Sequence, residues 1–262
     1  MAVFFAGHIA SFGFDATLAG EPWASMSDHS NGLFACLNMI QEWEYSRNVT
    51  FLRRVTFPFC RDALKFYQGW MTRRIDASWV NEADQANECN PSGPITVAGI
   101  AAQCWQNNTV FSNGYARRVA SALPSMAKQL GEAVDPQWEE IALKLDPLPT
   151  VRTNGTKSCP FNPPRSVIVL AGNYTGMKPH SACSGSGCCG VECGTRQCNT
   201  ACGAQVAGDG MMDVMGWPVF PGEAISLASP ESLQQTVRDT LQLSSEWGQG
   251  NSFCSIFSQA AR

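Results

Sequence analysis

Apolar residues recur at helical spacing through much of the first 150 positions. One stripe runs from Leu33 to Trp43, and another from Ala63 to Met71 with Pro58 near its first turn. Three more stripes cover residues 97–104, 119–130 and 138–145. Because each apolar stripe needs a buried partner, the pattern predicts antiparallel helical hairpins over residues 30–150.

Residues that start or stop helices flank these stripes. Pro124 predicts a bend in the fourth helix and Gly131 its end, and Asp135-Pro136 predicts the start of the fifth. A sixth helix is predicted from Ser229-Pro230-Glu231, and the last ten residues have the pattern of a seventh. The inward residues predicted for the sixth helix are Leu233, Val237, Thr240 and Leu241.

The pattern changes after residue 150. The run SVIVLA, residues 166–171, predicts a short buried strand. Residues 172–210 are rich in Gly, Ser and Cys and show no periodicity of apolar residues. We therefore expect an irregular insertion that packs poorly against the helices. A loop of this length is uncommon inside a compact domain. It is either stapled by disulfides or foreign to the native structure.

Composition narrows the possible partners and compartments. The net charge of −4 and the scattered basic residues give no reason to expect nucleic acid, and no apolar run is long enough for a membrane span. Twelve Cys beside three His favour an oxidising compartment. The sequence also has Asn-x-Ser/Thr sequons at Asn48, Asn107, Asn154 and Asn173, which favour the same secretory compartments. We expect an extracellular or lumenal protein, although the first 20 residues lack the basic start of a signal peptide.

Six of the cysteines lie between Cys183 and Cys202. Their spacing gives no pair of matched Cys-x2-Cys units, so disulfides are favoured over zinc, with fifteen possible pairings. His180, beside this cluster, is interpreted as a surface residue. No metal site and no organic cofactor are predicted.

Two regions combine carboxylates with aromatic residues. Residues 79–90 contain Glu82, Asp84 and Glu88 together with Trp79 and Asn81. Glycoside hydrolysis needs one protonated carboxylic acid and one carboxylate, and desolvation beside Trp keeps an acid protonated. An ordinary solvated loop is the competing interpretation.

The second such region places Asp209, Asp213 and Glu223 around Trp217. A Pro-Gly turn that enters a helix is the simpler explanation for Glu223. Motifs of P-loop, dinucleotide-binding, zinc-protease and α/β-hydrolase proteins are absent from the sequence.

Four segments resemble the six-hairpin glycosidases, in particular glycoside hydrolase family 95. They are EWEYSRNVTFLRRVTFPFCRDALKFYQGWM, NPSGPITVAGIAAQ, QLGEAVDPQWEEIALKLDPLPT and WPVFPGEAISLASPESLQQTVRDTL. Their order matches the family over roughly residues 30–150 and 215–262. The resemblance implies an (α/α)6 toroid that hydrolyses glycosides, α-L-fucosides among them, by inversion.

By position, the resemblance implies that Glu88 is the general acid, with Glu82 in reserve. Asp213 is the carboxylate nearest the place of the family's water-activating Asp, and Trp79 and Trp217 are the predicted substrate-binding residues. The sequence departs from the family because it lacks the His motif near that Asp, an encoded β-sandwich and several of the helices.

The sequence therefore predicts an all-α protein. We expect residues 1–262 to form one partial (α/α)6 toroid of antiparallel helical hairpins, interpreted as a fragment, with the irregular insertion at 172–210. The predicted function is acid/base hydrolysis of a glycosidic bond, with a carbohydrate substrate as partner. The alternatives are a non-catalytic carbohydrate-binding protein, a disulfide-rich secreted structural protein or an inactive truncated relative.

Overall fold

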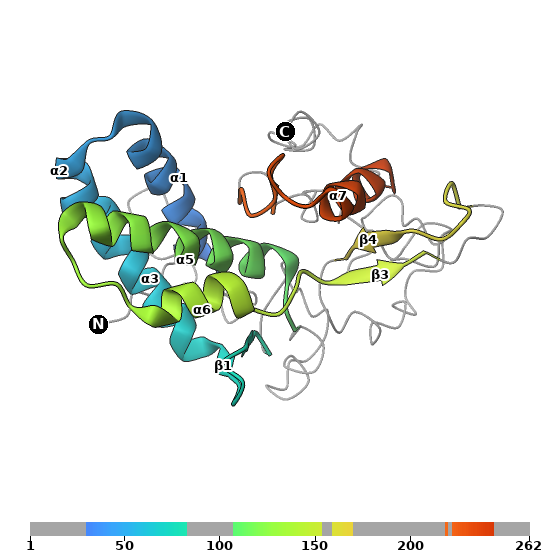
Figure 1. Ribbon diagram of the computed structural model, residues 1–262, viewed down its shortest axis with the longest axis horizontal. Helices are drawn as coiled ribbons and strands as arrows, with labels where there is room; N and C mark the ends of the chain where they lie inside the picture. Colours follow the sequence, from blue (N-terminus) through green and yellow to red (C-terminus); the bar gives the residue numbers. More distant parts are fainter. Residues whose placement is uncertain (1–29, 83–106, 154–158, 170–217, 220–221, 244–262) are drawn as a thin grey trace, which may run out of the picture. The chain divides into compact units, whose positions relative to one another are not determined.

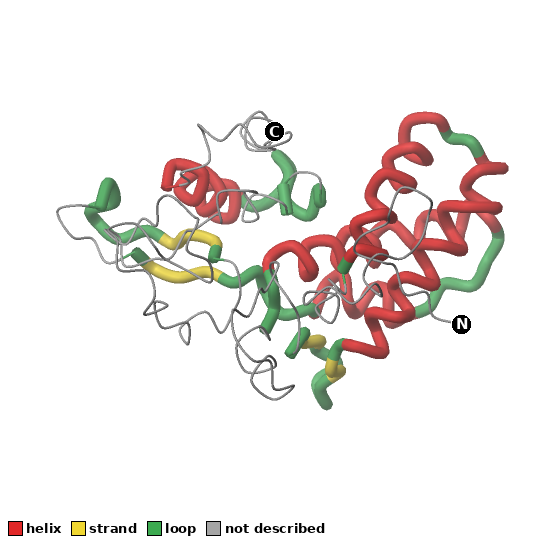
Figure 2. The backbone as a smooth tube through the Cα atoms, turned by 180° about the vertical axis from the view of Figure 1, so that it is seen from behind, coloured by secondary structure: helices red, strands yellow, loops and turns green. Residues whose placement is uncertain are grey.

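The computed structural model describes residues 30–82, 107–153, 159–169, 218–219 and 222–243. These residues are mainly helical (Figure 2), and every strand among them has three residues or fewer. The predicted mainly helical class is confirmed for this part of the chain. The chain divides into two compact units, one comprising Met1–Asn108 and Ser112–Pro147, the other Thr109–Phe111 and Leu148–Arg262.

The first unit begins with the hairpin formed by α1 (Asn31–Ser46) and α3 (Phe57–Trp70). The predicted stripe of α1 is buried along its whole length, from Leu33 through Ile40 to Trp43. The Thr56 hydroxyl donates to the Met39 carbonyl oxygen at 3.4 Å. The free thiols of Cys60 on α3 and Cys36 on α1 are hydrogen-bonded to each other. The residue numbers rise from Thr56 to Cys60 while those of their partners fall from Met39 to Cys36, so the two helices are antiparallel.

A short connection separates these helices, and the sequence pattern did not predict its form. Arg47 ends α1 with φ 53°, and Asn48 then caps α2 (Val49–Phe51). A π-helical turn, η2 (Leu52–Thr56), follows, in which the Phe57 N–H donates to the Leu52 carbonyl. Pro58 lacks an N–H and cannot join a regular helical ladder, so a widened turn just before it is consistent with its ring.

The second hairpin is formed by α5 (Val110–Leu130) and α6 (Pro136–Lys144). Gly131, at φ +71°, ends α5 as predicted: its N–H donates to the Lys128 carbonyl, and the Glu132 N–H to the Ala127 carbonyl. Asp135 starts α6 as predicted, because its carboxylate accepts the Gln137 N–H at 2.9 Å. Pro124 lies inside α5.

Side chains join the two hairpins into one core. The rings of Phe34 and Tyr115 lie 5.7 Å apart between α1 and α5, and those of Phe57 and Trp138 lie 6.2 Å apart between α3 and α6. On the side of α1 that faces α5, Arg118 forms an ion pair of 2.6 Å with Glu44. The predicted helical hairpins are therefore confirmed for α1–α3 and α5–α6, whereas the stripe at 97–104 lies outside the described residues.

A two-stranded hairpin extends the chain beyond α3. Its strands are β1 (Thr72–Arg73) and β2 (Trp79–Val80), antiparallel with Thr72 opposite Val80. The turn between them is held by the Arg74 N–H, which donates to the Ser78 carbonyl at 2.8 Å, and by the Asp76 carboxylate, which accepts the Ser78 hydroxyl. This hairpin carries the chain from α3 to the candidate site.

The second unit contains a small sheet covered by a helix. Strands β3 (Thr150–Arg152) and β4 (Ser166–Ile168) are antiparallel, and α7 (Glu231–Leu243) packs on β4. The Thr240 hydroxyl of α7 accepts the Ile168 N–H at 2.8 Å. The predicted strand and sixth helix are confirmed, with Val237, Thr240 and Leu241 buried and Leu233 only half-buried. The insertion at 172–210 and the last predicted helix lie outside the described residues.

Candidate functional site

The structure describes only part of the predicted site. Glu88, Asp213 and Trp217 lie outside the described residues. Trp79 belongs to β2 and is 3% exposed, so its ring contributes to the protein interior. Glu82 is exposed, and its carboxylate accepts the Thr72 hydroxyl at 2.9 Å.

Two asparagines close the base of the segment that contains Glu88. The Asn108 N–H donates to the Asn81 carbonyl oxygen at 2.7 Å, and the Asn81 N–H donates to the Asn108 side-chain oxygen at 3.0 Å. The chain leaves the described structure after Glu82 and re-enters it at Asn107. The chain is therefore held to itself by hydrogen bonds just before and just after residues 83–106. We call this pair of residues, Asn81 and Asn108, the asparagine clamp.

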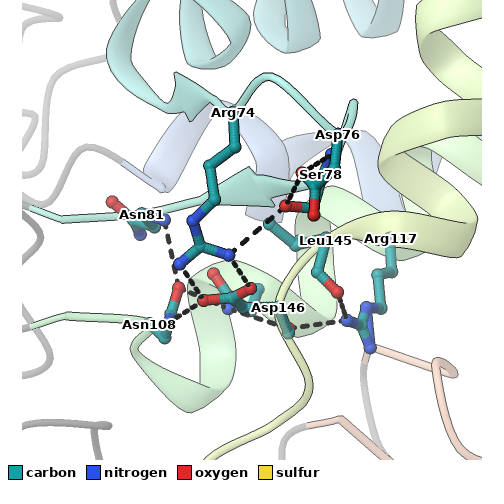
Figure 3. A network of polar contacts seen from close by, with 9 residues as sticks. Arg74, Asp76, Ser78, Asn81, Asn108, Arg117, Leu145 and Asp146 are labelled. Atoms are coloured by element: carbon teal, nitrogen blue, oxygen red, sulfur yellow. Dashed lines mark hydrogen bonds and ion pairs between the residues drawn. The ribbon is translucent and has the colours of Figure 1, made fainter.

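Asp146 joins this clamp to the β1–β2 hairpin. Its two carboxylate oxygens accept the Arg74 guanidinium at 2.6 and 3.0 Å, a bidentate arrangement that fixes geometry as well as charge. The same carboxylate accepts the side-chain N–H of Asn108 at 3.0 Å. Figure 3 shows Arg74 reaching from its turn toward Asp146, with Asn108 beside them.

Arg117 on α5 supports the same place from within the core. Its guanidinium donates to the carbonyl oxygens of Leu145 and Asp146, the latter at 2.6 Å. Burial lowers the pKa of Arg117, and the nearby Asp146 carboxylate opposes that shift. The hydrogen bonds fix the main chain just after α6, where Asp146 must point its side chain toward Arg74.

Side-chain hydrogen bonds also attach the clamp to α3 and α5. The Asn81 side chain is fully buried and donates to the Tyr67 hydroxyl of α3 at 2.9 Å. Asn113 on α5 donates to the Asn108 side-chain oxygen at 3.3 Å. Fully buried amides are costly unless they are hydrogen-bonded, so these contacts fix the position of the clamp on the helices.

The hairpin is tied to α6 by a second bidentate ion pair. The Arg73 guanidinium donates to both carboxylate oxygens of Glu140, at 2.8 and 3.0 Å. The hydrogen bond from Arg73 holds the pKa of Glu140 below its usual value. The adjacent residues Arg73 and Arg74 therefore tie the start of the hairpin's turn to α6 and to the chain just after α6.

This polar network joins Asn81 and Asn108 to Asp146 and Arg74, and its described carboxylates form no free pair. Within residues 30–82 and 107–153, Asp146 and Glu140 are both occupied by arginines. The described part of the chain contains no cluster of three or more His, Cys, Asp or Glu side chains placed to bind a metal.

Among the described residues, Cys36 and Cys60 are free thiols whose burial makes them poor nucleophiles. Cys36 and Cys60 are buried without exposure, and the Cys36 thiol donates to the Gly32 carbonyl at 3.2 Å. Burial, with the hydrogen bond to Cys60 second, raises the pKa of Cys36. Because the thiolate is the reactive form, this pair belongs to the packing of α1 on α3. The cysteines at 183–202 lie outside the described residues, and their predicted disulfides stay a prediction.

Sequence reasoning noticed Asn81 but missed Asn108, Asp146 and Arg74. Asp146 stands in a Leu-Asp-Pro segment that resembles a helix end, and Asn108 lies within a sequon. Neither pattern indicates contact with a residue more than 25 positions away. Comparison with protein-family models and with curated proteins finds no match to this chain. Among the described residues, no helix combines the length and apolar character of a membrane span.

Proposed function

We propose that this protein hydrolyses a glycosidic bond by inversion, with Glu88 as general acid and Asp213 as the carboxylate that activates water. The proposed architecture is a partial (α/α)6 toroid, in which α1–α3 and α5–α6 are two of the helical hairpins. The observation that carries the proposal is the asparagine clamp. It closes the base of the segment that contains Glu88 and ties that base to Asp146 and Arg74.

The clamp supports a catalytic loop for a physical reason. Catalytic groups are commonly carried by loops that a rigid scaffold positions. Here the scaffold is a set of buried amides and bidentate ion pairs, and Asn81 stands seven positions before Glu88.

The other predicted residues have supporting roles in this proposal. Glu82, the reserve acid, is exposed and accepts the Thr72 hydroxyl. Trp217 is the proposed sugar-stacking residue. Trp79 is buried under the hairpin, and a direct contact between its ring and a sugar stays a prediction. The proposed substrate is an extracellular or lumenal glycan, and the proposed reaction needs no cofactor.

Paired variants at two carboxylates test the acid role. Glu88→Gln keeps the side-chain shape but cannot donate a proton, so it should cut turnover of substrates with poor leaving groups by roughly a hundredfold or more. The loss should be much smaller on an activated aryl glycoside, whose leaving group needs little protonation. Glu82→Gln is the matched control and should leave both rates near the wild-type value.

A panel of aryl glycosides and oligosaccharides, α-L-fucosides first, supplies the substrates. Equal losses on both substrate types would argue against Glu88 as the acid, and wild-type rates in Glu88→Gln would move the role to Glu82. Asp213→Asn should lower both rates alike, because water must be activated whatever the leaving group. Proton NMR of the first product should show inverted anomeric configuration.

The alternative function is carbohydrate binding without hydrolysis. One observation favours this alternative. Among the described carboxylates, Asp146 and Glu140 form ion pairs with arginines and do not form an acid/base pair. Glycan-array binding by a protein that cleaves none of the panel would support this alternative. Absence of both binding and cleavage would overturn the carbohydrate assignment as a whole.

A further inference from the structure

The short turn that joins α1 to α2 presents a sequon in an acceptor-like geometry. Asn48, Val49 and Thr50 are all exposed. Asn48 has φ −71° and ψ 94°, which is extended backbone. Its side-chain oxygen accepts the Phe51 N–H at 3.0 Å. Within the described residues, its side-chain nitrogen donates no hydrogen bond.

That division of the amide matters for an N-linked glycan. The sugar is attached to the amide nitrogen of Asn in an Asn-x-Ser/Thr motif, and the amide oxygen is left in place. At Asn48 the oxygen caps α2 while the nitrogen is available, so a glycan leaves the cap intact. The helical turn that follows keeps its N-terminal hydrogen bond in both states.

The second described sequon differs in its exposure and in the conformation of its middle residue. In Asn107-Asn108-Thr109 the threonine is fully buried and Asn107 is half-buried. The middle residue, Asn108, has φ +50° and is held by Asn81 and Asp146. Because the hydroxyl of the third residue is part of the acceptor motif, this sequon is withdrawn from modification in the folded chain.

We propose that the folded protein carries an N-linked glycan at Asn48 and none at Asn107. Figure 1 shows α2 and β1 at opposite ends of the first helical hairpin. A glycan at Asn48 therefore projects from the end of that hairpin away from the asparagine clamp. The inference requires entry into the secretory pathway but is independent of the proposed hydrolysis.

Secretion of the full chain from a eukaryotic host behind a cleavable leader tests the proposal. Enzymatic release of glycans in ¹⁸O-labelled water converts each occupied Asn to labelled Asp, and peptide mass spectrometry reads the label. The expected result is label at position 48 and none at position 107. Thr50→Ala should abolish the label at position 48, whereas Thr50→Ser should retain it. Asn107→Gln should leave the glycan mass unchanged.

Two results would overturn the proposal. One is secreted, folded protein with unlabelled Asn48. The other is equal occupancy at Asn107. A synthetic peptide of residues 105–111, offered to purified oligosaccharyltransferase, separates sequence from fold: acceptance of the peptide beside an unmodified Asn107 in the protein shows that folding excludes it. Rejection of the peptide would remove the structural explanation for Asn107. Thr50→Ala, which keeps the Asn48 cap, should unfold at the same denaturant concentration as enzymatically deglycosylated wild type.

Discussion

The two ends of the α1–α3 hairpin are built by different means. At one end, the turn at Arg47 and Asn48 closes with contacts between residues at most four positions apart. At the other end, the contacts of Asn81, Asn108 and Asp146 include partners 27 to 72 positions away. The first end is exposed and self-sufficient, whereas the second depends on α3, α5 and the chain after α6 all being in place.

The difference means that the two ends should respond differently to substitution. A locally capped turn tolerates change, because a lost cap exposes only one or two backbone groups to water. A long-range polar network fails as a unit, because each removed partner leaves another buried group unsatisfied. We therefore expect substitutions at the clamp to cost more stability than substitutions at the turn.

The largest effect is expected for Asn108→Ala. The substitution removes hydrogen bonds to Asn81, Asn113 and Asp146, and it places alanine, which adopts the left-handed region less readily than asparagine, at φ +50°. Together these terms should lower the free energy of unfolding by roughly 2–4 kcal/mol. Urea denaturation followed by circular dichroism measures the loss.

Asn108→Gly is the matched control, because glycine adopts the positive φ without strain but also lacks the side chain. It should be more stable than Asn108→Ala while remaining less stable than wild type. Equal stability of Asn108→Gly and wild type would contradict the clamp. If the proposed function is correct, both variants should also lower turnover, since the base of the Glu88 segment is no longer held.

A smaller effect is expected at the opposite end. Asn48→Ala removes the oxygen that accepts the Phe51 N–H and should cost about 1 kcal/mol, the usual cost of losing an N-cap. Asn48→Asp keeps an acceptor in the same position and should remain near wild type. Unglycosylated protein from a bacterial host gives the cleanest measurement, and a loss at Asn48→Ala as large as at Asn108→Ala would erase the contrast between the ends.

The same contrast explains what the sequence could predict. The ends of α5 and α6 were predictable because Gly131 and Asp135 act through neighbours two to five positions away. The α1 stripe was predictable because burial follows the helical period. Asp146 was not, since its partners Arg74 and Asn108 lie 72 and 38 positions earlier and no local pattern brings them together.

The π-helical turn before α3 shows a further limit. Pro58 was placed correctly near the first turn of a helix, but the chain is already helical from Val49 onward. A proline marks where a regular ladder cannot continue, and it does not say whether the chain stops or widens there. The choice is set by packing, with Leu52 and Thr56 both buried against neighbouring elements.

The smallest effect is expected for the Arg73–Glu140 pair, because Arg73 is exposed and Glu140 is only half-buried. The pKa of Glu140 is lowered, chiefly by the hydrogen bond from Arg73. A carboxyl whose pKa is lower in the folded state stabilises the protein above its unfolded-state pKa, and that stabilisation disappears as the pH falls through the folded-state value. Glu140→Gln should therefore be slightly less stable than wild type near neutral pH, and the difference should vanish in strong acid. Urea titrations across the acid range at low salt should show it, and high salt should reduce it by screening. A deficit in Glu140→Gln that persists unchanged in strong acid would mean that packing, and not the ion pair, is what Glu140 contributes to holding the hairpin beside the clamp.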